Sequence, residues 1–367
     1  MKLDLHVIQS FGPNCLNRDD TNTPKDCEFG GYKRSRVSSQ CIKRAVRLFI
    51  KEGGLIPEGN LSIRTRLLAD KCIKGLVSLG KNESEAGMVV DNAIKTILHG
   101  KGVDKEGKTE YLLFIGNANV DDLVSLCDKY WDDLKKSPID KKEDAFAEFE
   151  NILKENKAVD LALFGRMLAD VPSGNMDAAC QVAHAVSTNR TEVEYDYFTA
   201  VDDLLPDEET GAGMIGSVEF TDPCYYRYAS LDLEQLKDNL NGNGDLLKGA
   251  VEAFIRAFSF AIPTGKQNSF AAQNPPSLVL AVLRDGMPWN LLNAFSNPVT
   301  PRNGGVIDNS VKALLGYWDS LTSVYGEQGT VASPWVVVGV DTGDGFGLAD
   351  SKADDFETLV KTIVDEL

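Results

Sequence analysis

The feature that most constrains this 367-residue sequence is the placement of its strand-like and helix-like segments. Residues 3–8 predict an opening strand, residues 12–37 a long ordered loop, and residues 38–52 a helix. After a breaker, helical periodicity continues to about residue 157. Strand-like and helix-like segments then alternate from Val159 onward. The sequence therefore predicts an α+β fold that carries a helical insertion.

The segments around and after this insertion can be assigned individually. Strands are expected at the apolar run 111–115 and then at 159–167, 194–201, 224–233, 277–285 and 334–340. Helices are expected near 244–261, 306–323 and 354–365. The stretch between the strands that end at 201 and begin at 224 is rich in Pro, Gly and acids. Such a stretch favours an extended hairpin or arm.

Composition limits the kind of partner. Lys and Arg number 38 against 55 Asp and Glu, so the net charge is −17 and any polyanion site must be local. The seven cysteines include no CxxC pair, which predicts neither a zinc cluster nor a disulfide framework. The sequence contains no signal peptide and no apolar run of about 18 residues. We expect a cytoplasmic protein with no metal, no cofactor and no membrane partner.

One basic run stands out in this acidic chain. Between residues 33 and 51 there is no acid, and the cations are Lys33, Arg34, Arg36, Lys43, Arg44, Arg47 and Lys51. Ser38 or Ser39 can cap the following helix. Its apolar face is expected to carry Ile42, Ala45, Val46, Phe49 and Ile50, with the last four cations opposite.

A row of phosphates is a suitable partner for this face. Four cations at helical spacing repel one another unless an anion lies among them. Gly30 and Gly31 allow backbone amides to approach such an anion, and Lys25 adds a further cation. A solvated basic helix face is the alternative. The adjoining helix N-terminus favours phosphate binding, and a Debye length of about 8 Å hides distant carboxylates.

Other motif matches carry less weight. The stretch GAGMIG at 211–216 follows no apolar strand, and Gly265–Lys266 lacks the remainder of a phosphate loop. The pairs Asp19–Asp20 and Asp202–Asp203 could hold a metal, but adjacent acids are mostly turn or capping residues. His184 is expected to be a packed helix residue.

The segments CLNRDDTNTPKD and FGGYKRSRVSSQCIKRAVR closely resemble the type I-E Cascade backbone subunit, the CasC family of CRISPR-associated proteins. Similar blocks continue through VDLALFGRM, AHAVSTNR, FTAVDD, YYRYASLDL and PTGKQNSFAAQNPP. The resemblance implies a palm like an RNA-recognition motif or ferredoxin, formed by residues 1–54 and 191–367. It also implies helical fingers at 55–190 and a projecting thumb at 199–223.

The resemblance further implies which residues hold a CRISPR RNA. The guide backbone would be held by Lys25, Arg36, Ser38, Gln40, Lys43, Arg44 and Arg47, with Arg18 nearby organising the loop. Lys266 would also bind the RNA. Met167 would wedge against bases, and Phe198 with Ile215 would be thumb contacts beside a displaced nucleotide. Binding would be independent of spacer sequence, so target DNA would be recognised by guide pairing.

The implied role is structural. Copies would stack head to tail in a helical filament along the CRISPR RNA, together with other Cascade subunits, in antiviral defence. No catalysis is expected. Two alternatives stay open: an endonuclease that uses a loop aspartate, as in type III backbone subunits, and a subunit that binds only proteins.

Overall fold

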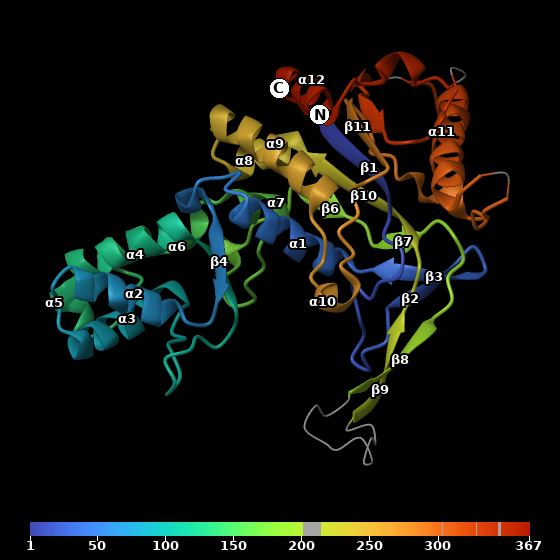
Figure 1. The fold of residues 1–367 in the computed structure, drawn as a ribbon. Coiled ribbons are helices and arrows are strands. Elements are labelled where there is room, and N and C mark those ends of the chain that lie inside the picture. Colours follow the sequence, from blue (N-terminus) through green and yellow to red (C-terminus); the bar gives the residue numbers. More distant parts are fainter. Residues whose placement is uncertain (201–213, 303, 328, 344–345) are drawn as a thin grey trace, which may run out of the picture. The chain divides into compact units, whose positions relative to one another are not determined.

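The computed structural model describes residues 1–200, 214–302, 304–327, 329–343 and 346–367 (Figure 1). The chain forms two compact units. The sheet unit comprises Met1–Phe49, Val182–Ser230 and Phe254–Leu367, and the helical unit comprises Ile50–Gln181 and Leu231–Ala253. The Asp202–Asp203 pair and the first three residues of GAGMIG lie outside the described residues.

A single sheet organises the sheet unit (Figure 1). Neighbouring strands pair antiparallel where β1 meets β11, where β10 and β3 each meet β7, and where β2 meets β3. The strand order is β12 (Thr330–Ala332), β11 (Leu278–Arg284), β1 (Lys2–Ser10), β10 (Cys224–Asp232), β7 (Ala185–Ser187), β3 (Tyr32–Val37) and β2 (Asp26–Phe29), with β13 (Trp335–Val337) also beside β11.

Both faces of this sheet are covered, and strand β10 shows how. Tyr226 and Tyr228 lie in an apolar core with Trp318. That core includes α11 (Val306–Tyr325) and the 3-10 helix η4 (Leu291–Phe295). On the other face, Arg227 donates hydrogen bonds to the carbonyls of Phe258 and Ser259 at the end of α9 (Gly244–Phe260). Alternate residues of one strand therefore serve two cores.

Helix α1 (Ser39–Glu52) covers the same face as the end of α9. Ile42 of α1 shares a small cavity with Val37 of β3, Ala185 of β7 and Tyr225 of β10. The predicted amphipathic pattern is confirmed, because Ile42, Ala45, Val46 and Ile50 are buried. Further helices among the described residues of this unit are α10 (Gln267–Phe270), α12 (Phe356–Asp365) and the 3-10 turn η5 (Ala349–Ser351).

A two-stranded hairpin leaves the sheet unit, formed by β8 (Glu194–Ala200) and β9 (Met214–Phe220). Every residue of β8 is exposed. The strand expected at 194–201 is confirmed over residues 194–200, with Val201 outside the described residues, and its partner begins within the predicted arm.

The helical unit has its own apolar core, which includes Leu76, Val90, Leu123 and Phe149. The strand predicted at 111–115 is confirmed as β5, which pairs antiparallel with β4. Its elements are η1 (Glu58–Asn60), β4 (Ser62–Thr65), α2 (Leu68–Ser78), α3 (Glu83–Ile97), β5 (Leu113–Gly116), α4 (Asn117–Lys129), α5 (Trp131–Leu134), α6 (Ala145–Lys154), α7 (Val159–Phe164), η2 (Pro172–Gly174) and α8 (Leu233–Asn239), and β6 (Cys180–Val182) leads out of it.

The predicted α+β class is confirmed, but two local predictions are wrong. The segment 159–167 is not a strand: Val159–Phe164 is helix α7, which ends where Gly165 adopts a positive φ of 70°. The segment 12–37 is not all loop, since its second half forms the β2–β3 hairpin. Polar and basic residues hid this edge strand pair. None of the helices in the described ranges has the length and apolar character needed to span a bilayer.

Candidate nucleic-acid interface

The N-terminus of α1 is the centre of the candidate site. Ser38 caps the helix, because its Oγ accepts a hydrogen bond of 3.3 Å from the backbone N–H of Cys41. The N–H of Ser38 itself donates to Oδ1 of Asn17 at 2.9 Å. Gln40 lies exposed in the first turn. The loop that contains Asn17 is thus fastened to the start of the helix.

That loop is held in a fixed shape by backbone hydrogen bonds. The N–H of Lys25 donates to the carbonyl of Asn17 at 2.9 Å, and the carbonyl of Lys25 accepts from the N–H of Arg36 at 2.8 Å. Arg18 donates from Nη1 to Asn22 at 3.1 Å. Lys25, Arg36 and the capped helix are therefore connected through one short segment.

Asp19 serves this loop as a turn residue. Its Oδ1 accepts hydrogen bonds from the N–H of Thr21 at 2.9 Å, from its hydroxyl at 2.8 Å and from the N–H of Thr23 at 3.0 Å. The hydroxyl bond from Thr21 contributes most to lowering the pKa of the Asp19 carboxyl. In the part of the chain that the structure describes, no three His, Cys, Asp or Glu side chains are grouped so that they could hold a metal ion.

A third segment, residues 263–271, packs against the loop. A Cβ on Gly265 would lie 2.3 Å from the carbonyl oxygen of Leu16, so only glycine allows this approach. Lys266 follows with a left-handed φ of 51°. At the other end of the segment, the ring of Phe270 lies 5.7 Å from the ring of Phe220 at the base of the hairpin. These contacts connect the α1 site to the β8–β9 hairpin.

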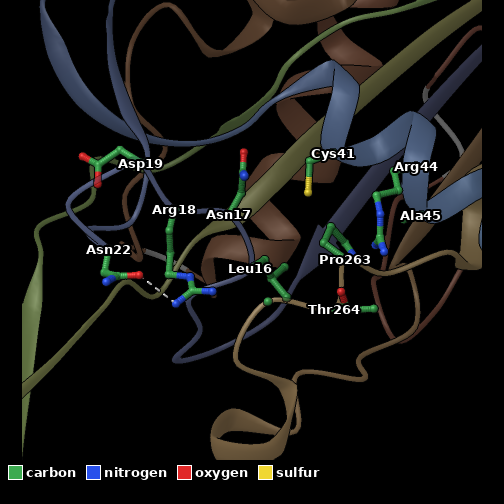
Figure 2. Close-up of a pocket in the computed structure, with 11 residues that line it drawn as sticks. Leu16, Asn17, Arg18, Asp19, Asn22, Cys41, Arg44, Ala45, Pro263 and Thr264 are labelled. Atoms are coloured by element: carbon green, nitrogen blue, oxygen red, sulfur yellow. Dashed lines mark hydrogen bonds between the residues drawn. The ribbon is translucent and has the colours of Figure 1, made fainter. Parts of the chain in front are cut away.

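A pocket of about 280 Å³ opens between these segments (Figure 2). Arg44 extends from α1 towards Pro263 and Thr264, and Arg18 borders the pocket from the loop (Figure 2). Arg44 makes no hydrogen bond or ion pair with any described residue. The cations around the pocket make it suited to an anionic ligand. The lining residues are Leu16, Asn17, Arg18, Asp19, Asn22, Cys41, Arg44, Ala45, Pro263, Thr264 and Gly265.

The polar face of α1 continues this basic surface. Arg44 and Lys51 are exposed, and Lys43 and Arg47 are half-buried. The cations thus lie opposite the buried apolar stripe, as the helical spacing predicts.

Arg34 belongs to the predicted basic run but is not part of its accessible surface. Its side chain is fully buried, with 0% exposed. Its Nη1 donates to the carbonyls of Ser187 and Thr188, both at 2.8 Å, and its Nη2 donates to the carbonyl of Phe295 at 2.7 Å. Burial lowers the pKa of this guanidinium. Arg34 therefore stabilises the fold and cannot reach a ligand.

Arg36 lies two residues further along β3 and is accessible. Its Nε donates to the carbonyl of Asp26 at 3.0 Å, and its Nη1 lies 2.9 Å from Nδ1 of His184. The expectation that His184 is packed in a helix is wrong, since it is exposed and directly precedes β7. Partial burial, Arg36 and Lys25 together lower the pKa of His184.

Phe198 and Ile215, two of the apolar residues of the predicted set, lie on paired strands of the hairpin. Phe198 pairs with Gly216, and Ile215 pairs with Thr199. Because neighbouring residues alternate between faces, Phe198 and Ile215 lie on opposite faces of the hairpin. Met167, which is 85% exposed, belongs to the helical unit. The hairpin pair can therefore contact two different ligands or two sides of one strand.

Sequence reasoning missed two residues of this site. Asn17 connects the loop to the helix, and His184 contacts Arg36. An Asn ahead of a basic run is too common to single out. No local signal could have paired His184 with a residue 148 positions away.

Similarity to solved structures identifies the class of protein. The chain is similar to a chain in a structure described as a CRISPR RNA-guided surveillance complex, pre-nicking, with 29% identity, a TM-score of 0.88 and full coverage of both chains. A second structure, described as a CRISPR RNA-guided surveillance complex, matches with 25% identity, a TM-score of 0.75 and full coverage of both. The match identifies a subunit of the Cascade backbone class.

The family follows from the sequence itself. The model of the CT1975-like protein family matches residues 3–362, so the chain belongs to that family. No curated protein matches it. The predicted relationship to CRISPR-associated backbone subunits is thereby confirmed, whereas the type I-E assignment stays a prediction.

Proposed function

We propose that this chain is the repeating backbone subunit of a type I-E Cascade complex and binds the spacer of the CRISPR RNA through its phosphates. One observation carries the proposal: in a chain of net charge −17, Arg18 of the loop and Arg44 of α1 line one pocket beside the capped N-terminus of that helix. Helix N-termini and clustered cations both favour phosphate. Because phosphates are the same in every spacer, binding is independent of sequence.

The contacts divide into two kinds. The sugar–phosphate backbone is bound by Arg18, Lys25, Arg36, Ser38, Gln40, Lys43, Arg44, Arg47 and Lys266. Met167, Phe198 and Ile215 contact base faces, since apolar and aromatic side chains accept any base. Backbone contacts fix the register of the guide, and its bases remain available for target DNA.

Copies of the subunit stack head to tail along the guide, with other Cascade subunits, and present it for pairing during antiviral defence in the cytoplasm. In this assembly the sheet unit acts as an RNA-recognition-like palm, the helical unit as fingers and the β8–β9 hairpin as a thumb. A contact that does not close into a ring generates such a filament.

The test is binding of the purified chain to labelled single-stranded RNAs of about 30 nucleotides and unrelated sequence, across a salt series. We expect equal affinities that fall steeply with salt. The Lys43→Ala plus Arg47→Ala variant should lower the salt slope by about 1.4, which corresponds to two lost phosphate contacts at about 0.7 each.

A matched variant removes the same charge elsewhere. Arg302→Ala plus Lys361→Ala takes one Arg and one Lys from exposed positions of the same unit. Its slope should equal that of the wild type. Equal slopes in all three proteins would reject the α1 site, and the absence of salt-dependent binding would leave only a protein-binding role.

The subunit performs no chemistry in this proposal. The carboxylate of Asp19 is engaged in its own turn. Incubation of the bound RNA with Mg²⁺ or Mn²⁺ should leave it intact. Cleavage that disappears in Asp19→Ala or Asp20→Ala would instead establish an endonuclease.

A further inference from the structure

The guanidinium of Arg36 is held within the sheet unit through Nε and Nη1, and its third nitrogen, Nη2, is available to a ligand. The Nε bond to the carbonyl of Asp26 and the Nη1 contact with His184 constrain the plane of the guanidinium. Its Nη2 makes no hydrogen bond within the described ranges. A guanidinium held in this way presents a fixed donor edge, which is the geometry that phosphate recognition uses.

The contact with Arg36 also fixes the state of His184. A guanidinium can only donate, so Nδ1 of His184 must accept and carry no proton. The ring is then neutral, with its hydrogen on Nε2. The lowered pKa of His184, which results from partial burial and from Arg36 and Lys25, agrees with this state.

We infer that His184 is a positioning residue for the RNA site: its Nδ1 holds Arg36 in the orientation in which the free edge of the guanidinium receives a phosphate. This inference rests on the proposed function. Its physical basis is the entropy cost of binding. An arginine side chain that is already held in its bound orientation loses less rotamer freedom when phosphate binds, and the affinity is higher for that reason.

The test compares RNA dissociation constants for the wild type, Arg36→Ala, His184→Ala and the double variant. We expect His184→Ala to weaken binding about threefold to tenfold, as for the loss of one exposed hydrogen bond of ordinary net strength. In the Arg36→Ala background the same change should have no effect, because the residue acts through Arg36. Since His184 is exposed, thermal unfolding should be unchanged in both single variants.

Two isosteric variants separate positioning from direct contact. The side-chain oxygen of His184→Asn can accept at the place of Nδ1, so this variant should stay within about twofold of the wild type. His184→Gln places its amide where Nε2 lies and should behave like His184→Ala. A direct phosphate contact from Nε2–H would reverse this order.

The outcomes distinguish the inference from the proposed function. Loss of affinity in Arg36→Ala with none in His184→Ala would overturn the inference alone. A His184→Ala effect that persists undiminished without Arg36 would also overturn it. If the wild type shows no salt-dependent RNA binding, or if Arg36→Ala binds normally, the proposed RNA site fails first.

Discussion

Arg34 and Arg36 lie two residues apart on β3 in the same basic run, yet the structure predicts opposite consequences for their loss. Arg34→Ala should destabilise the sheet unit. The variant removes the donors that Arg34 provides to the carbonyls of Ser187, Thr188 and Phe295, of which the Thr188 carbonyl keeps the N–H of Val299. It also creates a cavity where a fully buried side chain lay.

The magnitude follows from these contacts. Each buried carbonyl left without a donor costs about 1–3 kcal/mol, and this is partly offset because the guanidinium no longer has to be desolvated. We expect a net loss of about 3–5 kcal/mol from the carbonyls left without a donor and from the cavity together. At about 2–4 °C per kcal/mol for a domain of this size, Tm falls by about 6–20 °C.

Differential scanning calorimetry and urea unfolding measure this loss directly. Arg36→Ala is the matched control: it removes the same side chain from an accessible position, so its unfolding free energy should change by no more than about 0.5 kcal/mol. Its RNA affinity should fall instead. If Arg34→Ala unfolds within about 2 °C of the wild type, the assignment of Arg34 to the fold is wrong.

Two further predictions concern His6 and Gly265. Burial, and then Arg284, lower the pKa of His6 to about 3 from 6.5, so the stability it contributes is present above pH 6.5 and lost as pH falls towards 3. In urea unfolding, the free energy of unfolding should fall by about 2 kcal/mol between pH 7 and pH 5, and the His6→Gln variant should not show this fall. Equal stability of the wild type at both pH values would contradict the prediction. Gly265→Ala places a Cβ 2.3 Å from the carbonyl oxygen of Leu16 and should cost about 1–3 kcal/mol and lower RNA affinity, whereas Gly316→Ala, with open space around its Cβ, should be neutral or stabilising. Normal binding and stability in Gly265→Ala would show that the 263–271 segment is not needed at the site.

Much of the fold could be predicted because its periodicities are local. The strand at residues 3–8 and the helix at 38–52 were recognisable from the spacing of apolar residues alone. The β2–β3 hairpin was missed for a physical reason: its polar residues lie at the sheet edge, where burial does not impose alternation. Helix α7 was mistaken for a strand because a short apolar run has no distinguishing period.

The candidate site was predictable only where charge and helical spacing coincide. Lys43, Arg44 and Arg47 follow from the pattern of α1. Arg34 does not, because the carbonyls that bind it come from segments more than 150 positions away. Arg34 and Arg36 cannot be told apart by their spacing in the sequence. They differ because distant segments of the chain bury Arg34 and leave Arg36 accessible.

The net negative charge of the chain does not conflict with RNA binding at the basic α1 site, if the chain binds RNA as proposed. Carboxylates further than about 8 Å from a bound phosphate are largely screened and do not weaken the contacts at α1. They still disfavour close contact between RNA and the rest of the surface, where a strand would meet acids directly. A net charge of −17 thus restricts a polyanion to one face. For a subunit that repeats along one guide strand, as proposed, this restriction keeps the strand on the same face of each copy without any base being read.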